Sequence, residues 1–464
     1  MSTINNQGLS IIREIEPLLP GNVPNIKDRI VSGIYQQAEG ISAQVVRTEN
    51  LYQTSLEARL DGILTSRWLG FPIMLLLLTL VLWITITGAN YPSQLLASGL
   101  FWIEGQLLHL FAVWGAPTWL TGVLIQGMYR SLAWVVSVML PPMAIFFPLF
   151  TLLEDLGYLP RVAFNMDSLF RRAGAHGKQC LTMCMGFGCN AAGVTSCRII
   201  DSPRERLIAI LTNTFSICNG RFPTLIALAT IFMGTLVARA YSSMLATLAV
   251  VAIIMTGILT SLLVSYLLSR TLLQGVSSFF VLELPPFRKP QLGQILIRSL
   301  LDRTLFVLWR AVVIAAPAGA LTWILANSFV ADTSVFALIA GWLDPLGQLM
   351  GMDGIILIAF LLGLPANEIV LPILIMGYLS AGSMLELDSL NALQTLLLDH
   401  GWTWITALCV MLFSLLHFPC GTTLYTIFKE TRSARWTIMA ALIPLALGIL
   451  VTFIVNQGAQ IIFS

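Results

Sequence analysis

The sequence contains little charge for its length. Only 10% of its 464 residues are Asp, Glu, Lys or Arg, whereas an average soluble domain has about 25%. Hydrophobic residues make up 57%, and they occur in blocks long enough to cross a bilayer. This composition argues against a secreted enzyme, a nucleic-acid-binding protein and a disordered scaffold. It predicts an all-α polytopic membrane protein.

Several enzyme motifs are also missing. The nearest string to a phosphate-binding loop, from Gly174 to Lys178, has the wrong spacing, and neither HExxH nor GxSxG occurs. We therefore expect no enzymatic activity and no cofactor, and any GTP hydrolysis would come from a separate chain. The seven cysteines are an odd number, and several lie inside apolar runs, which argues against a disulfide framework.

The polar and apolar stretches divide the sequence into three parts. Residues 1–66 are the main polar stretch, and the mixture of charged and apolar residues from Asn25 to Ser66 indicates amphipathic helix. We interpret residues 1–66 as a cytoplasmic helical neck, because basic residues collect there and the positive-inside rule applies. A first membrane half is expected at 67–300 and a second at 301–464, with about 8–10 transmembrane segments. The apolar stretches are 71–87, 95–114, 119–153, 206–238, 242–269, 304–330, 354–380, 392–418 and 436–462.

Two short motifs recur in the two halves. GFGCNAAG at residues 186–193 aligns with GLPANEIV at 363–370, which pairs Asn190 with Asn367. ICNGRFPT at 217–224 aligns with FPCGTTLY at 418–425, which pairs Cys218 roughly with Cys420. The interval between the motifs is about 25 residues longer in the second half, so an insertion is expected there. Such paired, Gly/Pro-interrupted apolar segments indicate two inverted repeats with broken helices and a transport site at their interface.

Six residues at these interruptions are candidate metal ligands: Cys189, Asn190, Cys218, Asn367, Glu368 and Cys420. Thiol and amide groups at a helix break can replace water around a transition-metal ion. Ordinary helix packing is the alternative for the cysteines. Arg221, close to Cys218, either lies inside a span or marks its end. His417, close to Cys420, is either an auxiliary ligand or a hydrogen-bonded histidine.

Glu368 is flanked by apolar residues on both sides. A carboxylate at the centre of a membrane helix costs about 2.5–3.5 kcal/mol on insertion scales. It therefore needs a cation, a proton or a donor as its partner. The functional interpretation is a metal ligand or proton-coupled gate, and the alternative is a structural ion pair with Arg310 or another buried base.

These motifs are similar to those of a known family. The strings EARLDGILTSRWLGFPI (57–73), EDLGYLPRVAFNMDSLFRR (154–172), GFGCNAAGV, ICNGRFP and HFPCGTT resemble the membrane part of FeoB-type ferrous iron transporters. The resemblance covers about residues 55 to 460 and includes both Gate, or nucleoside-recognition-like, regions of that family. It implies Fe²⁺ transport across a bacterial inner membrane, with Cys189, Cys218 and Cys420 along the ion path.

The resemblance also bears on partners and cargo. The family fuses a GTPase and a helical domain ahead of its membrane part, and this sequence retains at most the end of that helical domain. A separate FeoB-like GTPase or a small accessory protein is therefore a candidate partner, and a homo-oligomer is compatible with the sequence. Additional sulfur at Cys180, Cys184 and Cys197 keeps other divalent metals open as cargo. Transport of a nucleoside-like solute, or a membrane scaffold or sensor without transport, are the alternatives.

Overall fold

The computed structural model describes residues 26–45, 56–66, 68–233, 239–275, 304–330, 332–385 and 390–463, together with Gly293 and Ile297. The chain divides into two compact units, residues 1–60 with 278–281 and residues 61–277 with 282–464. In the N-terminal region, α2 (Ile26–Val45) and α3 (Leu56–Leu64) provide the helix predicted between residues 25 and 66. The rest of the predicted neck, residues 1–25 and 46–55, lies outside the described residues.

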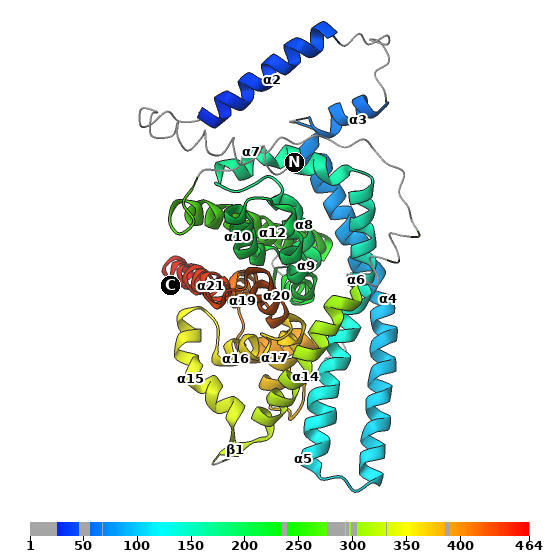
Figure 1. The fold of residues 1–464 in the computed structure, drawn as a ribbon. Helices are drawn as coiled ribbons and strands as arrows, with labels where there is room; N and C mark the ends of the chain where they lie inside the picture. Colours follow the sequence, from blue (N-terminus) through cyan, green and yellow to red (C-terminus); the bar gives the residue numbers. More distant parts are fainter. Residues whose placement is uncertain are drawn as a thin grey trace. The chain divides into compact units, whose positions relative to one another are not determined.

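The second unit is helical almost throughout (Figure 1). Its first half contains α4 (Gly70–Val113), α5 (Thr118–Thr121), η2 (Gly122–Tyr129), α6 (Arg130–Asp155), α7 (Tyr158–Arg172), α8 (Gln179–Gly188), α9 (Asn190–Ser196), η3 (Cys197–Ile199), α10 (Pro203–Thr212), η4 (Asn213–Phe215), η5 (Asn219–Arg221), α11 (Phe222–Leu228), η6 (Ala229–Met233) and α12 (Arg239–Arg270). Its second half contains α14 (Phe306–Asn327), β1 (Phe329–Val330), β2 (Thr333–Ser334), α15 (Val335–Leu349), α16 (Gly354–Leu362), η9 (Asn367–Ile369), α17 (Val370–Tyr378), α18 (Leu390–Asp399), α19 (Trp404–Leu416), α20 (Gly421–Thr431) and α21 (Ala434–Phe463). The two strands pair antiparallel, with Phe329 opposite Ser334.

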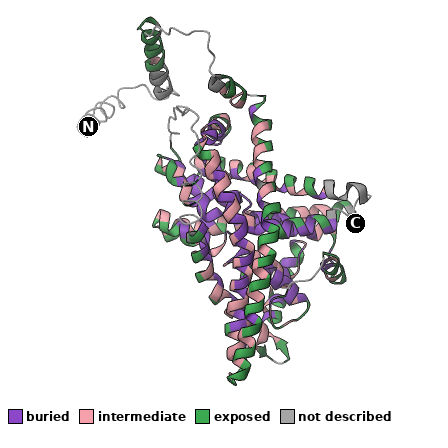
Figure 2. Cartoon of the chain, turned by 90° about the vertical axis from the view of Figure 1, so that its right-hand side faces the viewer, coloured by how far each residue is buried: buried purple, intermediate pink, exposed green. Residues whose placement is uncertain are grey.

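The all-α polytopic architecture is confirmed. Within the described residues, seven helical stretches are long and apolar enough to cross a membrane, and α15 with α16, bent by 110°, makes an eighth if the two form one span. Seven spans is one fewer than the lower end of the expected range of 8–10, and eight meets it. Buried residues, purple in Figure 2, are concentrated inside the bundle, while helices at its periphery expose many large apolar side chains. Exposed apolar side chains in such number are suited to contact with lipid.

The first two predicted stretches, 71–87 and 95–114, are not separate segments. They form the single helix α4, which has 44 residues and contains Pro92. At 1.5 Å per residue the helix is about 66 Å long, more than twice the hydrocarbon thickness of a bilayer. The polar residues between the two stretches did not stop the helix, because α4 packs along α6 and this tertiary contact supports it.

Two helix pairs fold back on themselves as hairpins. In the first, α8 and α9 pack together, and the Thr182 hydroxyl contacts the Cys197 sulfur across the turn at Cys189. In the second, α16 and α17 pack together, and the Tyr378 hydroxyl donates to Asp353 at 2.5 Å. The other two interrupted pairs, α10 with α11 and α19 with α20, each continue across their break as one span. Figure 1 shows the α8–α9 hairpin on one side of α20 and the α16–α17 hairpin on the other.

The backbone confirms the internal repeat that the motifs predicted. Cys189 (φ −159°, ψ 126°) and Ala366 (φ −151°, ψ 117°) precede the second helix of each hairpin in the same conformation. Cys218 (φ −77°, ψ 160°) and Cys420 (φ −61°, ψ 156°) likewise precede matching helix starts. Contacts between the halves are reciprocal too, because α9 packs on α20 and η5 packs on η9. The longer interval in the second half contains α18, which lies between α17 and α19 and has no counterpart between α9 and α10 in the first half.

A buried ion pair fixes α3 to α7. Arg161 is 1% exposed, and its Nε and Nη2 lie 2.7 and 3.3 Å from the two carboxylate oxygens of Asp61. The Asn165 amide adds a bond to the Leu64 carbonyl at 2.7 Å. These contacts attach the start of the membrane unit to the helix that precedes the first hairpin.

Replacing Arg161 by Gln should destabilise the protein, because Asp61 then lacks its partner and a buried site loses its charge balance. We expect the free energy of unfolding to fall by about 3 kcal/mol, measured as a lower apparent melting temperature in detergent. The matched control is Lys178→Gln, which breaks the pair with Asp201, a residue with an 89% exposed side chain. The control should change stability by less than about 1 kcal/mol. Equal effects of the two variants would contradict a structural role for the Arg161 pair.

Candidate functional site

All six predicted ligands line one small cavity inside the bundle. Cys189, Asn190, Cys218, Asn367, Glu368 and Cys420 surround a space of about 20 Å³ together with Met139, Met143, Gly188, Asn219, Gly220, Ala311, Pro365, Ala366 and Thr422. That volume holds about one water-sized particle. The structure therefore brings together residues that are up to 231 positions apart in the sequence. Their role as metal ligands stays a prediction.

Four helices begin at this cavity without a side-chain cap. They are α9 after Cys189, η5 after Cys218, η9 after Ala366 and α20 after Cys420. Elsewhere the helix starts are mixed: Ser202 caps α10, Ser334 caps α15, Asp353 caps α16 and Thr403 caps α19, whereas helices such as α7 and α8 also begin without a side-chain cap. A cysteine thus occupies three positions where Ser, Thr or Asp is usual. First-turn amides favour negative charge at a helix start, which suits a deprotonated thiol or a carboxylate, and the Ala192 and Thr423 amides lie within hydrogen-bonding reach of the Cys189 and Cys420 sulfurs.

The amides of Asn367 and Asn190 differ in how far they are free to bind a ligand. Asn367 is 4% exposed; its Nδ2 lies 4.0 Å from the Cys218 sulfur, and its Oδ1 is buried without a hydrogen-bond partner in the described structure. The nitrogen of Asn190 instead faces the carbonyls of Gly186 and Ser216, at 3.1 and 3.0 Å. Asn190 therefore joins the first hairpin to the break before η5, and only its oxygen remains for a ligand.

Glu368 enters the cavity opposite Gly220. A Cβ atom added at Gly220 would lie 2.0 Å from the Glu368 Oε1, so only glycine leaves room for the carboxylate there. The predicted alternative is an ion pair with Arg310 or another buried base. Among the described residues the Arg310 pair is not found: Arg310 donates to the Thr426 hydroxyl at 3.1 Å and stacks on Tyr425. The buried guanidinium of Arg221, however, lies close enough for its charge to act on Glu368. The indole of Trp134 donates to the Glu368 carbonyl at 3.2 Å and holds this turn against α6.

Arg221 and His417 lie beside the cavity but do not line it. Arg221 is 1% exposed and donates to the carbonyls of Leu415 and Phe418 at 2.9 and 3.2 Å. It therefore lies inside a span and does not mark its end. Its guanidinium caps the carboxyl end of α19, where a cation is favoured. The Nδ1 atom of His417 is 3.0 Å from the carbonyls of Phe413 and Ser414, while its Nε2 is buried without a hydrogen-bond partner in the described structure.

Sequence reasoning missed two sulfur atoms in the cavity wall. Met139 and Met143 lie one turn apart on α6, on either side of Pro141 and Pro142, and both line the cavity. Thioethers are soft ligands, and the paired prolines were a signal of an irregular span. Among the described residues, no three His, Cys, Asp or Glu side chains converge closely enough for a closed metal site. The described side chains therefore do not form a closed metal site of the kind that holds a structural ion.

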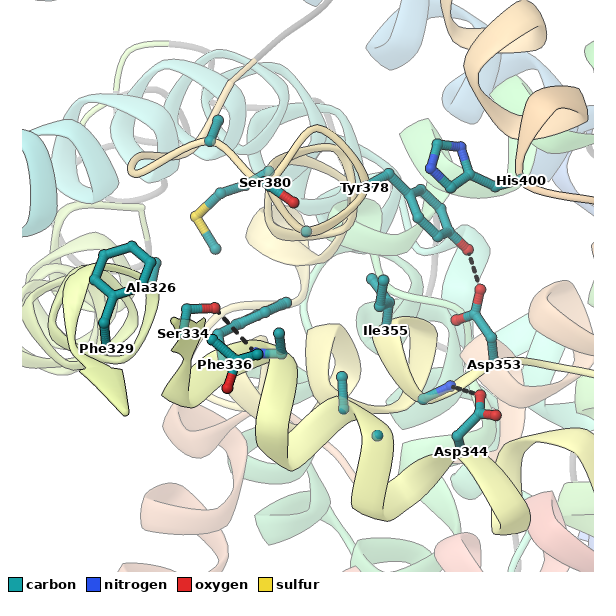
Figure 3. Close-up of a pocket in the computed structure, with 18 of the residues that line it drawn as sticks. Ala326, Phe329, Ser334, Phe336, Asp344, Asp353, Ile355, Tyr378, Ser380 and His400 are labelled. Atoms are coloured by element: carbon teal, nitrogen blue, oxygen red, sulfur yellow. Dashed lines mark hydrogen bonds between the residues drawn. The ribbon is translucent and has the colours of Figure 1, made fainter. Parts of the chain in front are cut away.

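A larger cavity lies at the base of the second hairpin (Figure 3). It has a volume of about 630 Å³ and is lined by residues of α15, α16, α17 and the β1–β2 turn. Three carboxylates, of Asp332, Asp344 and Asp353, line it, and none of its described lining residues is Lys or Arg. Asp344 accepts from the Gly354 amide at 2.9 Å and so fixes the bend between α15 and α16. Helix α16 runs from this cavity toward the small one, and α17 runs back from the small cavity to this one.

Comparison with known proteins agrees with this arrangement. A family model described as Gate, nucleoside recognition, matches residues 136–232 and 308–434, and a model described as Ferrous iron transport protein B C terminus matches residues 250–302. The Fe(2+) transporter FeoB of Staphylococcus aureus (strain MSSA476) is 27% identical over 98% of this chain and 68% of that protein. The chain is similar to the membrane part of FeoB ferrous iron transporters over almost its whole length.

Other FeoB relatives match over different lengths. The Fe(2+) transporter FeoB of Escherichia coli (strain K12) is 32% identical over 58% of this chain and 34% of that protein. A Fe(2+) transport protein A/Fe(2+) transporter FeoB fusion protein of Porphyromonas gingivalis (strain ATCC BAA-308 / W83) is 24% identical over 91% of this chain and 54% of that protein. No solved structure matches the chain. The two Gate matches fall on α6 to η6 and on α14 to α20, the two halves of the structural repeat.

Replacing Asn190 by Asp should weaken the wall of the small cavity. A carboxylate cannot donate to the Gly186 and Ser216 carbonyls, and unsatisfied buried polar groups cost about 1–3 kcal/mol. We expect a lower apparent melting temperature than for Asn391→Asp, a control at an exposed position of α18. An Asn190→Asp protein as stable as this control would show that the bridging bonds are unimportant.

Proposed function

We propose that this chain transports Fe²⁺ through the small cavity, as a FeoB-like permease. The observation that carries the proposal is that the thiols of Cys189, Cys218 and Cys420, the Glu368 carboxylate and the Asn367 oxygen line one space at four uncapped helix starts. Soft sulfur and hard oxygen together suit a borderline metal ion. The FeoB relatives, named as Fe(2+) transporters, support iron as the cargo.

Charge balance determines the state of the thiols during transport. The formal charges of Glu368 and Arg221 offset each other, so these two side chains leave nothing to balance a divalent cation. Two thiols must therefore lose their protons when the ion enters, because the thiolate is the form that ligates metal. Each ion that enters the cavity then releases protons, and uptake should decrease as the pH falls.

The volume of the cavity argues against a nucleoside as cargo. Sites for small organic molecules usually measure about 300–1,000 Å³, whereas this cavity holds about 20 Å³. A metal ion fits only after it has lost most of its hydration shell. The acidic 630 Å³ cavity at the base of α16 and α17 is suited to collect hydrated cations before that step, since a cleft with charge of one sign concentrates the opposite ion.

The proposal includes an orientation and partners. Lys178, Arg198, Arg204 and Arg270 lie at the base of the first hairpin, while the cavity at the second hairpin is acidic. On the positive-inside rule, the first base would face the cytoplasm of a bacterial inner membrane. The N-terminal region is assigned to the cytoplasm separately, from its own basic residues. The protein A–FeoB fusion supports a small accessory partner, and a FeoB-like GTPase acting from a separate chain would provide energy or gating.

The decisive experiment measures radiolabelled Fe²⁺ uptake into reducing proteoliposomes by a Cys189→Ser/Cys420→Ser variant. Serine is a better helix cap than cysteine, so the variant should fold at least as well as the wild type. We expect uptake to fall at least about tenfold, because the soft ligands are gone while the fold remains. The matched control is Cys409→Ser, since Cys409 is fully buried in α19 and does not line the cavity.

Each outcome of this experiment discriminates between functions. Normal uptake by the double variant would show that the Cys189 and Cys420 thiols are not ligands on the ion path. Loss of uptake in the control as well would indicate damage to packing. Wild-type protein that binds Fe²⁺ without moving it would favour a sensor or scaffold. Wild-type uptake of Zn²⁺ or Mn²⁺ in preference to Fe²⁺ would show that the transported ion is another metal, while the proposed path through the cavity would stand.

Replacing Gly220 by Ala tests the carboxylate separately. The new methyl group would occupy the position of the Glu368 Oε1 and displace the carboxylate from the cavity. We expect uptake to fall about as far as in Glu368→Gln, with a smaller change in melting temperature because the flexible end of Glu368 can move. Gly105→Ala on α4, where nothing lies within 4 Å of the added methyl group, is the control. Normal uptake by Gly220→Ala would argue against the carboxylate as a ligand.

A further inference from the structure

A third cavity, at the end of the bundle opposite the acidic one, carries four arginines. It has a volume of about 450 Å³ and lies where the carboxyl ends of α7 and α12 meet the start of α10. Its lining consists of Arg171, Arg172, Gly174, Arg204, Tyr266, Ser269, Arg270, Gln274 and Gly275. Among the residues that the structure describes, no Asp or Glu lines it.

Arg204 is fixed at the wall of this cavity. Its Nε donates to the Leu273 carbonyl, and its Nη2 lies 3.5 Å from the Ser269 carbonyl. Its Nη1 is buried and has no hydrogen-bond partner in the described structure. A buried guanidinium nitrogen without an acceptor is costly. Arg204 also lies in the first turn of α10, where the helix dipole disfavours a cation. The cavity is therefore short of an acceptor or an anion at this point.

The other arginines add positive charge around the same space. Arg171 and Arg172 end α7, and Arg270 ends α12 with its guanidinium 5.4 Å from the Tyr266 ring centroid. The helix dipole favours cations at the carboxyl ends of α7 and α12, which explains in part why arginines occur there. Among the described residues of this cavity, Arg171 pairs with Asp167 at 3.7 Å, and this exposed pair offsets little of the charge.

Gly174 brings these elements together. It has φ of +69°, and a Cβ atom added to it would lie 2.2 Å from the Ser269 hydroxyl. A residue with a side chain would therefore hold the end of α7 away from α12. Because the close approach needs glycine, the grouping of arginines from α7, α10 and α12 is part of the fold and does not arise from long side chains on a loose surface.

We propose that this cavity binds a phosphate group at the membrane surface. Guanidinium groups match phosphate oxygens with paired hydrogen bonds, and the volume is within the usual range for a ligand site. The α12 span ends at Arg270, so the cavity lies where a lipid headgroup region begins. On the neighbouring α7, Phe164 and Leu169 are 49% and 40% exposed, as in helices that lie at a membrane interface. The phosphate belongs either to an anionic phospholipid or to a soluble phosphate compound.

The test compares wild-type protein with an Arg204→Gln/Arg270→Gln variant. One arm counts phosphatidylglycerol and phosphatidylcholine molecules retained in native mass spectrometry of protein from mixed nanodiscs. The other arm measures the melting temperature with inorganic phosphate against chloride at equal ionic strength. The matched control is Arg432→Gln/Arg435→Gln, which removes two exposed arginines from the same end of the bundle, where Glu430 pairs with Arg198.

Two results support the site and two overturn it. Selective retention of phosphatidylglycerol by wild type and control, weakened about fivefold per arginine in the variant, identifies a lipid headgroup. Stabilisation by inorganic phosphate alone, lost only in the variant, identifies a soluble phosphate. Equal binding by variant and control, or no preference for either phosphate source in the wild type, rejects the proposal. Because neither arm measures iron, the result of this binding test does not depend on whether the protein transports Fe²⁺.

Discussion

The backbone polar groups at four interrupted helices are the constraint on which this structure depends. Inside a membrane, an amide or carbonyl that loses its helical partner must find another, since no lipid group can replace it. At Cys189, Cys218, Ala366 and Cys420 the first amides of a helix are uncapped, and the four breaks meet. A single break exposed to lipid would be too costly. Together, the four breaks form a polar interior that lipid does not reach.

The repeat explains how two hairpins and two broken spans reach the same place. Matching backbone conformations at Cys189 and Ala366, and at Cys218 and Cys420, show that each half supplies one hairpin turn and one span break. The halves interlock because α9 packs on α20 and η5 on η9. The cavity exists only when both halves are assembled, because each half supplies part of its lining.

The two ends of the bundle carry side chains of opposite charge. The large cavity beside the second hairpin is lined by three Asp residues, whereas the base of the first hairpin is lined by arginines. Between them, Arg221 satisfies the carboxyl end of α19 and lies close enough to Glu368 for their charges to interact. On the proposed route from the acidic end to the basic end, a cation would meet repulsion from the arginines at its exit. Sulfur ligands, which can gain and lose protons, are suited to such a passage.

Sequence alone determined the membrane class, the two motif pairs and the six residues of the small cavity, because scarce charge, isolated glycines and a lone carboxylate are costly in lipid wherever they occur. It could not determine that residues 71–114 form one helix, since the supporting contact with α6 is tertiary. It also missed Met139 and Met143, which share an apolar helix with many ordinary core residues. Only the tertiary structure decided that Arg221 is buried, that the Asn190 nitrogen binds backbone and that four arginines meet, because each depends on which distant segments pack together.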